Sequence, residues 1–373
     1  MFDVAVIGAG IAGLTVAQQL HQAGYKVVVV DKSRGVGGRV ATRRLQGTCA
    51  DHGLRYLEPQ GKLSEKLIDV LGVQQSDFAG NRGILQVWEN PVYEWEPAKP
   101  NSSSLLPRYV APMGMNAIAK FLATGLEMQM NQRVQEITAT DEKTWHFTFE
   151  QKADPLIAKA VVVAIPAPQA LMLLEPLAKT IPTEFLDSLR AVEFDPCLSV
   201  MAGYPASRQQ DLSNAETGNF PLHLDVTHDS DLSWIGLDSS KRPNPQMPVF
   251  VLHSTAEFAN RYLDAEDLNP VARQMLSHAA QLLVPWLDSP EWFQIHCWRY
   301  AFPSRPLDLD CLDAGTPLPL VCCGDWCGGN LVEGAMNSGL AAAVKINQQM
   351  EMRSLPGESF LEALQQISSR SDR

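Results

Sequence analysis

The chain has 373 residues, more than one hydrophobic core usually serves, so we expect two domains. Hydrophobic residues make up 45% of the chain and charged residues 19%, proportions typical of a globular protein with a large core. The net charge of −12 argues against nucleic acid or an anionic membrane as the main partner.

The first element that we expect is a strand over residues 2–7, followed by a glycine-rich turn at Gly8, Gly10 and Gly13. In the dinucleotide-binding turn, Gly8 would allow the tight bend and Gly10 would let the backbone approach a pyrophosphate. Gly13 would let the following helix pack closely on the strand. The motif alone is weak evidence for a dinucleotide site, because glycine-rich turns are common. The strands and the helix on either side of it make the prediction more specific.

The helix after this turn is expected over about residues 11–23, and the N–H groups at its start, on Ile11 and Ala12, would face the phosphates. A second strand over residues 27–30 ends at Asp31, 23 residues after the first glycine. A carboxylate at this place accepts a hydrogen bond from a ribose hydroxyl. Together, these elements predict a dinucleotide site.

A loop rich in glycine and arginine follows over residues 31–44. Its paired glycines, which include Gly38, let a ligand approach the backbone, and Arg39 can neutralise a pyrophosphate. The alternative for Arg39 is an incidental surface charge. Lys32 and Arg34 fit solvated charges better, although Lys32 is kept among the candidate cofactor contacts.

Further along the chain, the apolar pattern alternates between helical and strand spacing. Helices are expected over about residues 63–71, 115–122, 269–284 and 334–349, and short strands over about 84–106, 127–130, 134–138, 145–149, 160–165, 198–204, 234–237, 249–253 and 320–323. Proline, aspartate and serine become frequent after about residue 184, which favours an inserted second domain. The end of the chain after residue 354 is expected to fray.

A third motif follows the last expected strand, at Gly324 and Asp325. An acid placed after a strand and a glycine suits contact with a ribityl chain. The start of the next helix, with Gly334, Ala335 and Asn337, offers N–H groups to the pyrimidine end of a flavin. This motif lies 316 residues after the first glycine. One long cofactor that contacts both motifs would explain the pair, and this favours FAD over NAD, which would need a shorter reach.

These motifs resemble the flavin-containing amine oxidase superfamily. Several segments are more specifically similar to renalase and its bacterial relatives, namely residues 109–115, 161–168, 251–255 and 298–300. The resemblance extends from residue 2 to about residue 345, dense in the cofactor motifs and sparse in the insert.

The resemblance implies an α/β, two-domain FAD-binding fold of the glutathione-reductase type. A Rossmann-type parallel sheet would bind FAD, and a β-rich α+β domain would cover the substrate. The expected limits are 1–66, 107–183 and 297–353 for the FAD-binding domain, 67–106 and 184–296 for the substrate domain, and 354–373 for a C-terminal tail.

By the same resemblance, the protein would be an FAD-dependent oxidoreductase that oxidises dihydropyridine isomers of NAD(P)H, with dioxygen as acceptor and hydrogen peroxide as product. A flavin amine oxidase or dehydrogenase acting on a small amine is the first alternative. A non-catalytic flavin-binding redox protein is the second. Because no Ser-Gly-Gly-Cys tether is present in the sequence, the FAD is expected to be non-covalent.

The resemblance also assigns roles around the cofactor. The backbone of Val134 would meet the adenine. Trp298 and Tyr300 would wall the flavin face, although ordinary aromatic core is the alternative for both and for Trp326.

His253, Tyr300 and Arg55 are the candidate catalytic residues, and two of them are candidates for contact with the substrate. His253 matches a histidine of the family's segment, and a satisfied core histidine is the alternative. Arg55 stands where relatives usually have glutamine, and it either binds an anionic substrate or pairs with a carboxylate. Arg299 is a further candidate cation.

The expected partner is a small molecule, with a nicotinamide dinucleotide among the candidates. No stretch reaches the roughly 18 apolar residues of a membrane span, and because a strand is expected from residue 2 onward, we expect no signal peptide. Seven cysteines without zinc spacing favour reduced thiols, a cytoplasmic location and no metal.

Overall fold

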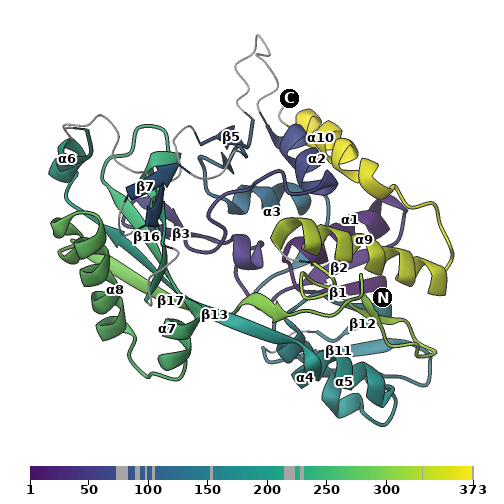
Figure 1. Ribbon diagram of the computed structural model, residues 1–373. Helices are drawn as coiled ribbons and strands as arrows, with labels where there is room; N and C mark the ends of the chain where they lie inside the picture. Colours follow the sequence, from purple (N-terminus) through teal and green to yellow (C-terminus); the bar gives the residue numbers. More distant parts are fainter. Residues whose placement is uncertain are drawn as a thin grey trace.

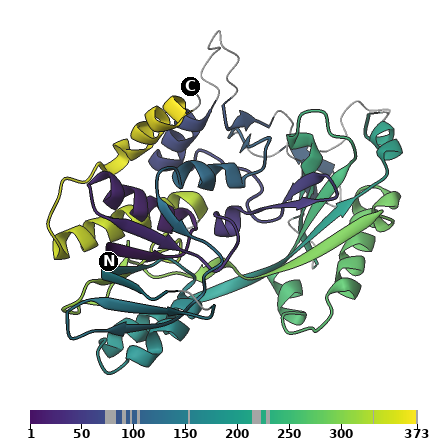
Figure 2. The same ribbon diagram turned by 180° about the vertical axis from the view of Figure 1, so that it is seen from behind.

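The computed structural model has two lobes joined by long strands (Figures 1 and 2). It describes residues 1–72, 83–88, 93–96, 99–102, 106–151, 154–213, 223–226, 231–329 and 331–371. Parts of the strand region expected over 84–106 therefore lie outside the described residues.

The first lobe contains an eight-stranded sheet whose centre is parallel. Its strands are β1 (Phe2–Ile7), β2 (Val27–Val30), β9 (Glu127–Gln129), β10 (Val134–Ala139), β11 (Trp145–Phe149), β12 (Leu156–Val163), β18 (Leu312–Asp313) and β19 (Leu320–Cys322). Strands β19, β12, β1, β2 and β9 run parallel in that order, with the β10–β11 hairpin and β18 added antiparallel. The predicted Rossmann-type sheet is confirmed.

Strand β1 is buried on both faces, as its continuous apolar run indicates. Val4 and Val6 pack into one cluster and Ala5 and Ile7 into another, because successive side chains point to opposite faces. The first cluster includes residues of α1 (Ile11–Gln22), α3 (Asn116–Leu122) and α9 (Leu331–Gln349), and the second those of α4 (Ala167–Leu174) and α5 (Thr183–Ala191). This is helix–sheet–helix layering.

The second lobe is built on a seven-stranded, mostly antiparallel sheet of order β17-β13-β16-β15-β14-β6-β7. The strands are β6 (Tyr93–Glu96), β7 (Lys99–Ser102), β13 (Glu193–Gly203), β14 (His223–Asp225), β15 (Leu232–Leu237), β16 (Val249–Ser254) and β17 (Trp292–Arg305). Residues of α7 (Ala256–Arg261) and α8 (Asn269–Leu282) share a cluster with one face of it.

Alternation along β16 decides which side chains turn toward the first lobe. Phe250 and Leu252 join the cluster with α8, whereas Val249 and Val251 join the first lobe's cluster. His253 has the parity of Val249 and Val251, so its side chain lies on the same face. The second sheet therefore presents this histidine toward the nucleotide-binding lobe.

The long strands β13 and β17 run between the lobes (Figures 1 and 2). Their pairing shifts in register around Pro196, where three residues of β17 lie opposite one of β13. The domain limit that we expect at residue 297 falls inside β17, which begins at Trp292 soon after the turn residues Asp288, Ser289 and Pro290.

Smaller elements complete the chain. They are the hairpin β3 (Thr42–Leu45) and β4 (Thr48–Asp51), the pair β5 (Gln86–Val87) and β8 (Tyr109–Val110), helices α2 (Lys62–Leu71) and α6 (Gln209–Ser213), and 3-10 helices η1 (Gly38–Val40), η2 (Glu175–Leu177), η3 (Ala206–Arg208), η4 (Asp238–Lys241), η5 (Pro285–Asp288) and η6 (Gly357–Ser359). The loop expected over 31–44 thus ends in a turn of helix and a strand.

The C-terminal segment differs from the expected fraying tail. It forms α10 (Phe360–Ser371), whose Phe360, Leu361 and Leu364 are fully buried in the first lobe's core. These apolar positions have helical spacing, and α10 lies beside α2 (Figure 1). Helices α4 and α5 also lie outside the expected elements, since proline near the start of α4 suits a first helical turn as well as a strand end.

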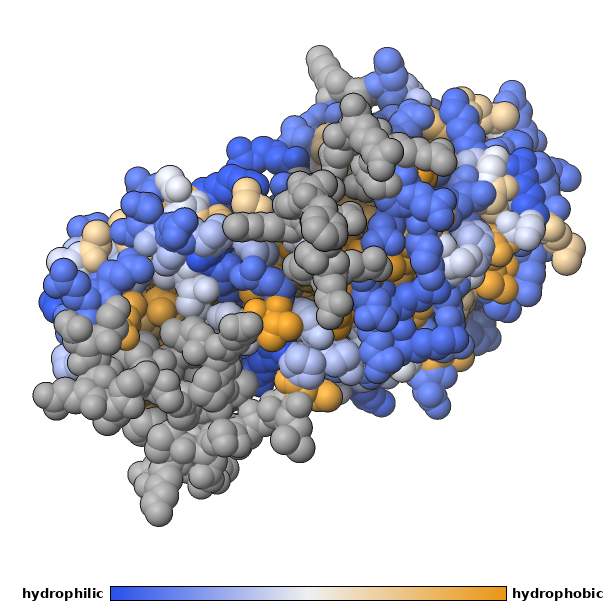
Figure 3. All heavy atoms as spheres, turned by 90° about the horizontal axis from the view of Figure 1, so that it is seen from above, coloured by the Kyte–Doolittle hydropathy of each residue, from blue (hydrophilic) through white to orange (hydrophobic). Residues whose placement is uncertain are grey.

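The surface view in Figure 3 shows how polar and apolar residues are distributed on one face of the molecule. Seen from above, the described residues are mostly hydrophilic, with the hydrophobic ones in scattered groups (Figure 3). No helix in the described ranges has both the length and the apolar character needed to cross a membrane.

Candidate active site

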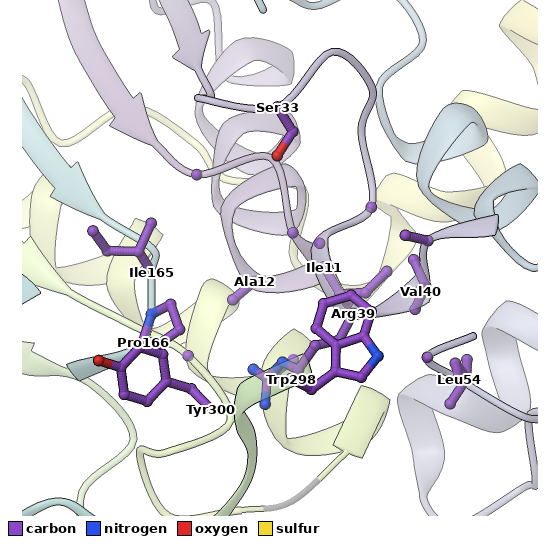
Figure 4. Close-up of a pocket in the computed structure, with 18 of the residues that line it drawn as sticks. Ile11, Ala12, Ser33, Arg39, Val40, Leu54, Ile165, Pro166, Trp298 and Tyr300 are labelled. Carbon is purple, nitrogen blue, oxygen red and sulfur yellow. The ribbon is translucent and has the colours of Figure 1, made fainter. Parts of the chain in front are cut away.

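A large cavity of about 1910 Å³ is lined by residues of both lobes. Ile11 and Ala12 from α1, Arg39 from the glycine-rich loop, and Trp298 and Tyr300 from β17 border it (Figure 4). Of the candidate residues from the sequence, those that line it are Gly8, Gly10, Ile11, Ala12, Asp31, Lys32, Gly38, Arg39, Arg55, Val134, His253, Trp298, Tyr300, Gly324, Asp325 and Ala335.

The glycine turn at the start of α1 has the shape of a phosphate cradle. Gly8 has φ +110°, and a Cβ at Gly13 would lie 2.0 Å from the carbonyl oxygen of Gly8. At Gly10, by contrast, a Cβ would meet no protein atom within 4 Å. The turn therefore leaves open space where the first N–H groups of α1 meet the cavity.

Asp31 directly follows β2, and its carboxylate stabilises this turn through hydrogen bonds. One carboxylate oxygen accepts the N–H of Ala9 at 2.7 Å, and the other accepts the N–H of Ser33 at 2.7 Å. A carboxylate has about four acceptor positions, so two are left for ribose hydroxyls. Lys32 and Val134 line the same end of the cavity.

Arg39 and Asp325, which the sequence suggested for two different parts of a cofactor, pair with each other. The guanidinium Nη1 and Nη2 lie 2.7 and 2.6 Å from the two oxygens of Asp325, and Nη1 also donates to the carbonyl oxygen of Ala301 at 3.0 Å. Such a bidentate pair is geometrically specific. It joins the glycine loop, β17 and the segment after β19.

Three candidate residues are absent from the described cavity lining. Gly13 acts through close packing, and Gly334 does so too, since its Cβ would lie 2.4 Å from the carbonyl carbon of Gly329. Asn337 is exposed and donates to Glu333 at 3.2 Å. Its neighbour Glu333 caps α2 by accepting the backbone N–H groups at the start of that helix.

The opposite end of the cavity joins Arg55 to His253. Arg55 Nε donates to His253 Nδ1 at 3.0 Å, and the guanidinium carbon lies 5.1 Å from the ring centre of Trp234. Arg55 Nη2 also lies 3.3 Å from Ser233 Oγ. Burial, and then the charge of Arg55, hold the pKa of His253 well below its ordinary value, so this histidine is neutral.

Two histidines that sequence reasoning missed line the same region. His52 is stacked on Trp298 with ring centres 5.1 Å apart, and His296 meets Trp298 edge-on at 4.3 Å. The indole N–H of Trp298 donates to the carbonyl oxygen of His52 at 2.8 Å. His296 stands two residues before Trp298, and strand alternation was the signal that could have found it.

These two histidines are also neutral near pH 7. Burial lowers the pKa of both, to about 3 for His52 and to about 4 for His296. The proximity of His296 adds to this effect at His52, and the positive charge of Arg43 adds to it at both. The aromatic group of His52, His296 and Trp298 is therefore an uncharged platform beside Arg43.

The other aromatic and basic candidates, Tyr300, Trp326 and Arg299, also line the cavity and are engaged by other protein groups. Tyr300 packs edge-on against Phe194 at 5.6 Å. Trp326 is fully buried and donates to the carbonyl oxygen of Ile165 at 3.1 Å. Arg299 pairs at the surface with Asp264 at 2.9 Å.

Behind this end of the cavity lies a buried cluster of four charges, Asp51, Asp238, Lys241 and Arg242. Arg242 contacts the carboxylates of Asp51 and Asp238 at 2.7 and 2.9 Å, and Lys241 lies 2.6 Å from Asp238. Burial alone would raise the pKa of Asp51, but the charges of Lys241 and Arg242 hold it below its ordinary value. The cluster joins the β3–β4 hairpin to the second sheet. Its member Asp51 directly precedes His52 in the sequence.

The sequence matches the family described as flavin containing amine oxidoreductase over residues 92–347, and an NAD(P)-binding Rossmann-like domain over residues 6–71. The chain belongs to the flavin-containing amine oxidoreductase family. Its cofactor is therefore FAD, which fits the open cradle at Gly10 and the length of the cavity.

Known relatives agree at the level of the superfamily. The chain is 42% identical over 79 residues to a possible lysine-specific histone demethylase 1 of Drosophila melanogaster, covering 20% of this chain and 9% of that protein. It is 36% identical over 77 residues to an L-amino-acid oxidase of Siganus canaliculatus, covering 20% and 15%. The match spans less than a fifth of either relative.

Solved structures share the fold over nearly the whole chain. Putrescine oxidase bound to putrescine has a TM-score of 0.67 at 14% identity, covering 93% of this chain and 99% of that one. Cyclohexylamine oxidase from Brevibacterium oxydans IH-35A has a TM-score of 0.66 at 16% identity, covering 94% and 99%. The expected two-domain FAD-binding fold is confirmed.

Proposed function

We propose that this FAD-dependent oxidoreductase resembles renalase in its reaction and oxidises the 2- and 6-dihydropyridine isomers of NAD(P)H. Bound FAD supplies a hydride acceptor that dioxygen can reoxidise to give hydrogen peroxide. The substrate ring loses a hydride, which is a proton with two electrons, and leaves as the aromatic pyridinium of NAD(P)+. Solvent provides the second proton of the peroxide.

The charge of the cavity lining carries this proposal. Five carboxylates line the cavity in the described part of the chain, and each is already engaged by a protein group. The pairs are Asp31 with the N–H groups of Ala9 and Ser33, Glu58 with Arg108, Glu150 with Arg133, Asp325 with Arg39, and Glu333 with the N–H groups of Leu63 and Ser64. An ammonium substrate would find no unpaired carboxylate among them, whereas Arg43 and Arg55 suit an anion.

The neutral histidines support the same substrate class. A general base works best when its pKa lies near the working pH, and those of His52, His253 and His296 are far lower. Hydride loss from a dihydropyridine needs no base, because the pyridinium carries no proton that must leave. Oxidation of an amine starts from an ammonium ion that has to lose one.

The remaining residues would hold and orient the two ligands. The start of α1 and Gly10 would bind the FAD pyrophosphate, and Asp31 its ribose. Trp298 and Tyr300 would face the flavin, and the platform of His52, His296 and Trp298 would exclude water. We expect acid precipitation to release the FAD, because the sequence has no Ser-Gly-Gly-Cys segment that could tether it covalently.

An amine substrate is the second candidate, and the fold shared with putrescine and cyclohexylamine oxidases is the observation that favours it. It would require an ammonium or amine to bind beside Arg43 and Arg55. The engaged carboxylates make this the weaker candidate.

Oxygen consumption and peroxide formation by the purified holoenzyme test the proposal. The panel is 2- and 6-dihydro-NAD(P), ordinary NAD(P)H, putrescine and cyclohexylamine. We expect turnover with the dihydro isomers at least about a hundredfold faster than with the amines, a barrier difference of about 2.7 kcal/mol. Turnover with amines alone would overturn the proposal, and turnover with none would favour a non-catalytic flavoprotein.

A further inference from the structure

We propose that Arg43, together with His296, forms a binding subsite for the pyrophosphate of the dinucleotide substrate. This inference rests on the proposed function, and it names a residue that determines specificity. It concerns a second dinucleotide, separate from the FAD that the glycine turn holds.

The strand β3 aims Arg43 into the cavity. Its neighbour Thr42 points the other way, where its hydroxyl donates to the buried carboxylate of Asp51 at 2.7 Å. Successive side chains of a strand point to opposite faces, so Arg43 faces away from the buried charges. Its Nη2 lies 3.5 Å from His296 Nδ1, and both residues line the cavity.

Among the described residues, Arg43 makes no ion pair with a carboxylate. Three other arginines that line the cavity do, since Arg39 pairs with Asp325, Arg133 with Glu150 and Arg299 with Asp264. Arg34 and Arg44 also line the cavity without a carboxylate partner among the described residues, but unlike Arg43 they are exposed. Arg43 is a half-buried cation that the described chain leaves for an external anion.

The chemistry around Arg43 fits a phosphate attached to a flat ring. A guanidinium presents paired N–H donors that match phosphate oxygens. Arginine can only donate, so Nδ1 of His296 accepts and the proton of this neutral ring sits on Nε2, a further donor. The platform of His52, His296 and Trp298 offers adjoining aromatic surface for a nicotinamide ring.

The test compares substrates with and without phosphate on Arg43→Ala and Arg43→Lys holoenzymes. The substrates are 6-dihydro-NAD and 6-dihydronicotinamide riboside, which lacks the pyrophosphate. We expect Arg43→Ala to lower kcat/KM for the dinucleotide at least tenfold more than for the riboside, through KM, with partial recovery in Arg43→Lys. An equal effect on both substrates would overturn the inference while leaving the proposed function intact.

A binding measurement separates the two failures. NAD+ is titrated into wild type, Arg43→Ala and Arg305→Ala while the flavin absorbance is followed. Arg305 is a matched control, because it lies on β17, pairs with Glu193 at the surface and is outside the described lining. Weakening of at least tenfold in Arg43→Ala alone supports the subsite even if no dihydropyridine is oxidised. Equal affinity in all three, or no binding to wild type, overturns it.

Discussion

At the scale of single residues, Asp51 is the centre of the contacts behind the substrate end of the cavity. Its carboxylate accepts from Thr42 and from the backbone N–H of Met115, and it pairs with Arg242. The residue is fully buried and lies directly before His52, whose carbonyl oxygen receives the indole N–H of Trp298. Asp51 therefore fixes the chain segment that carries one side of the aromatic platform.

Substitution of Asp51 tests this role. Asp51→Asn keeps the shape but removes a buried negative charge next to Lys241 and Arg242, and such a loss costs about 3 kcal/mol. Urea unfolding of the holoprotein should show this decrease in the free energy of unfolding. Glu193→Gln, which removes half of an exposed pair with Arg305, should cause no measurable change. A decrease below about 1 kcal/mol in Asp51→Asn would contradict the account.

The lowered pKa of His52 predicts how stability depends on pH. Between the ordinary pKa near 6.5 and the folded value of about 3, the unfolded chain binds a proton that the folded chain does not. The stabilisation is complete above pH 6.5 and is lost as the pH falls toward 3. From pH 7.5 to 5.5, His52 should account for a loss of about 1 kcal/mol.

The variant His52→Gln cannot titrate, so its stability should fall less over this interval. The measurement is the urea midpoint of wild type and variant holoprotein at pH 7.5 and 5.5. Equal losses in the two proteins would show that His52 takes up its proton at similar pH in both states.

At the scale of elements, the turn between β1 and α1 combines two kinds of glycine. Gly10→Ala places a methyl group where no protein atom lies within 4 Å, so the apoprotein should fold normally. The same methyl group would stand where the FAD pyrophosphate approaches, and we expect FAD affinity to fall at least about tenfold, or 1.4 kcal/mol. Flavin titration of the apoprotein measures this.

Gly13→Ala should behave differently, because its methyl group would collide with the carbonyl oxygen of Gly8. We expect lower thermal stability of the apoprotein as well as weaker FAD binding. Unchanged FAD affinity in Gly10→Ala would rule out the proposed cradle.

The elements also show what could be read from the sequence. The strand–turn–helix around Gly10 and the strand β2 were predictable, because local spacing and backbone freedom decide them. The pairing of Arg39 with Asp325 was not, since 286 residues separate the two and only the tertiary fold brings them together. The same holds for His52, whose contact with Trp298 spans 246 residues, whereas strand alternation with Trp298 could have indicated His296.

At the scale of the whole molecule, the two lobes contribute different halves of one site. The parallel sheet places the glycine turn and Asp31 at one end of the cavity, and β16 and β17 place His253, His296 and Trp298 at the other. The first half matches the FAD that the family implies. The second half, with its cations and neutral rings, is where the substrate proposal lies.

The most direct test of this account is anaerobic stopped-flow reduction of the bound flavin by 6-dihydro-NAD, compared with putrescine. We predict rapid bleaching of the flavin absorbance by 6-dihydro-NAD, with one NAD+ formed per flavin, and no bleaching by putrescine on the same timescale. Rapid bleaching by putrescine with none by 6-dihydro-NAD would contradict the account.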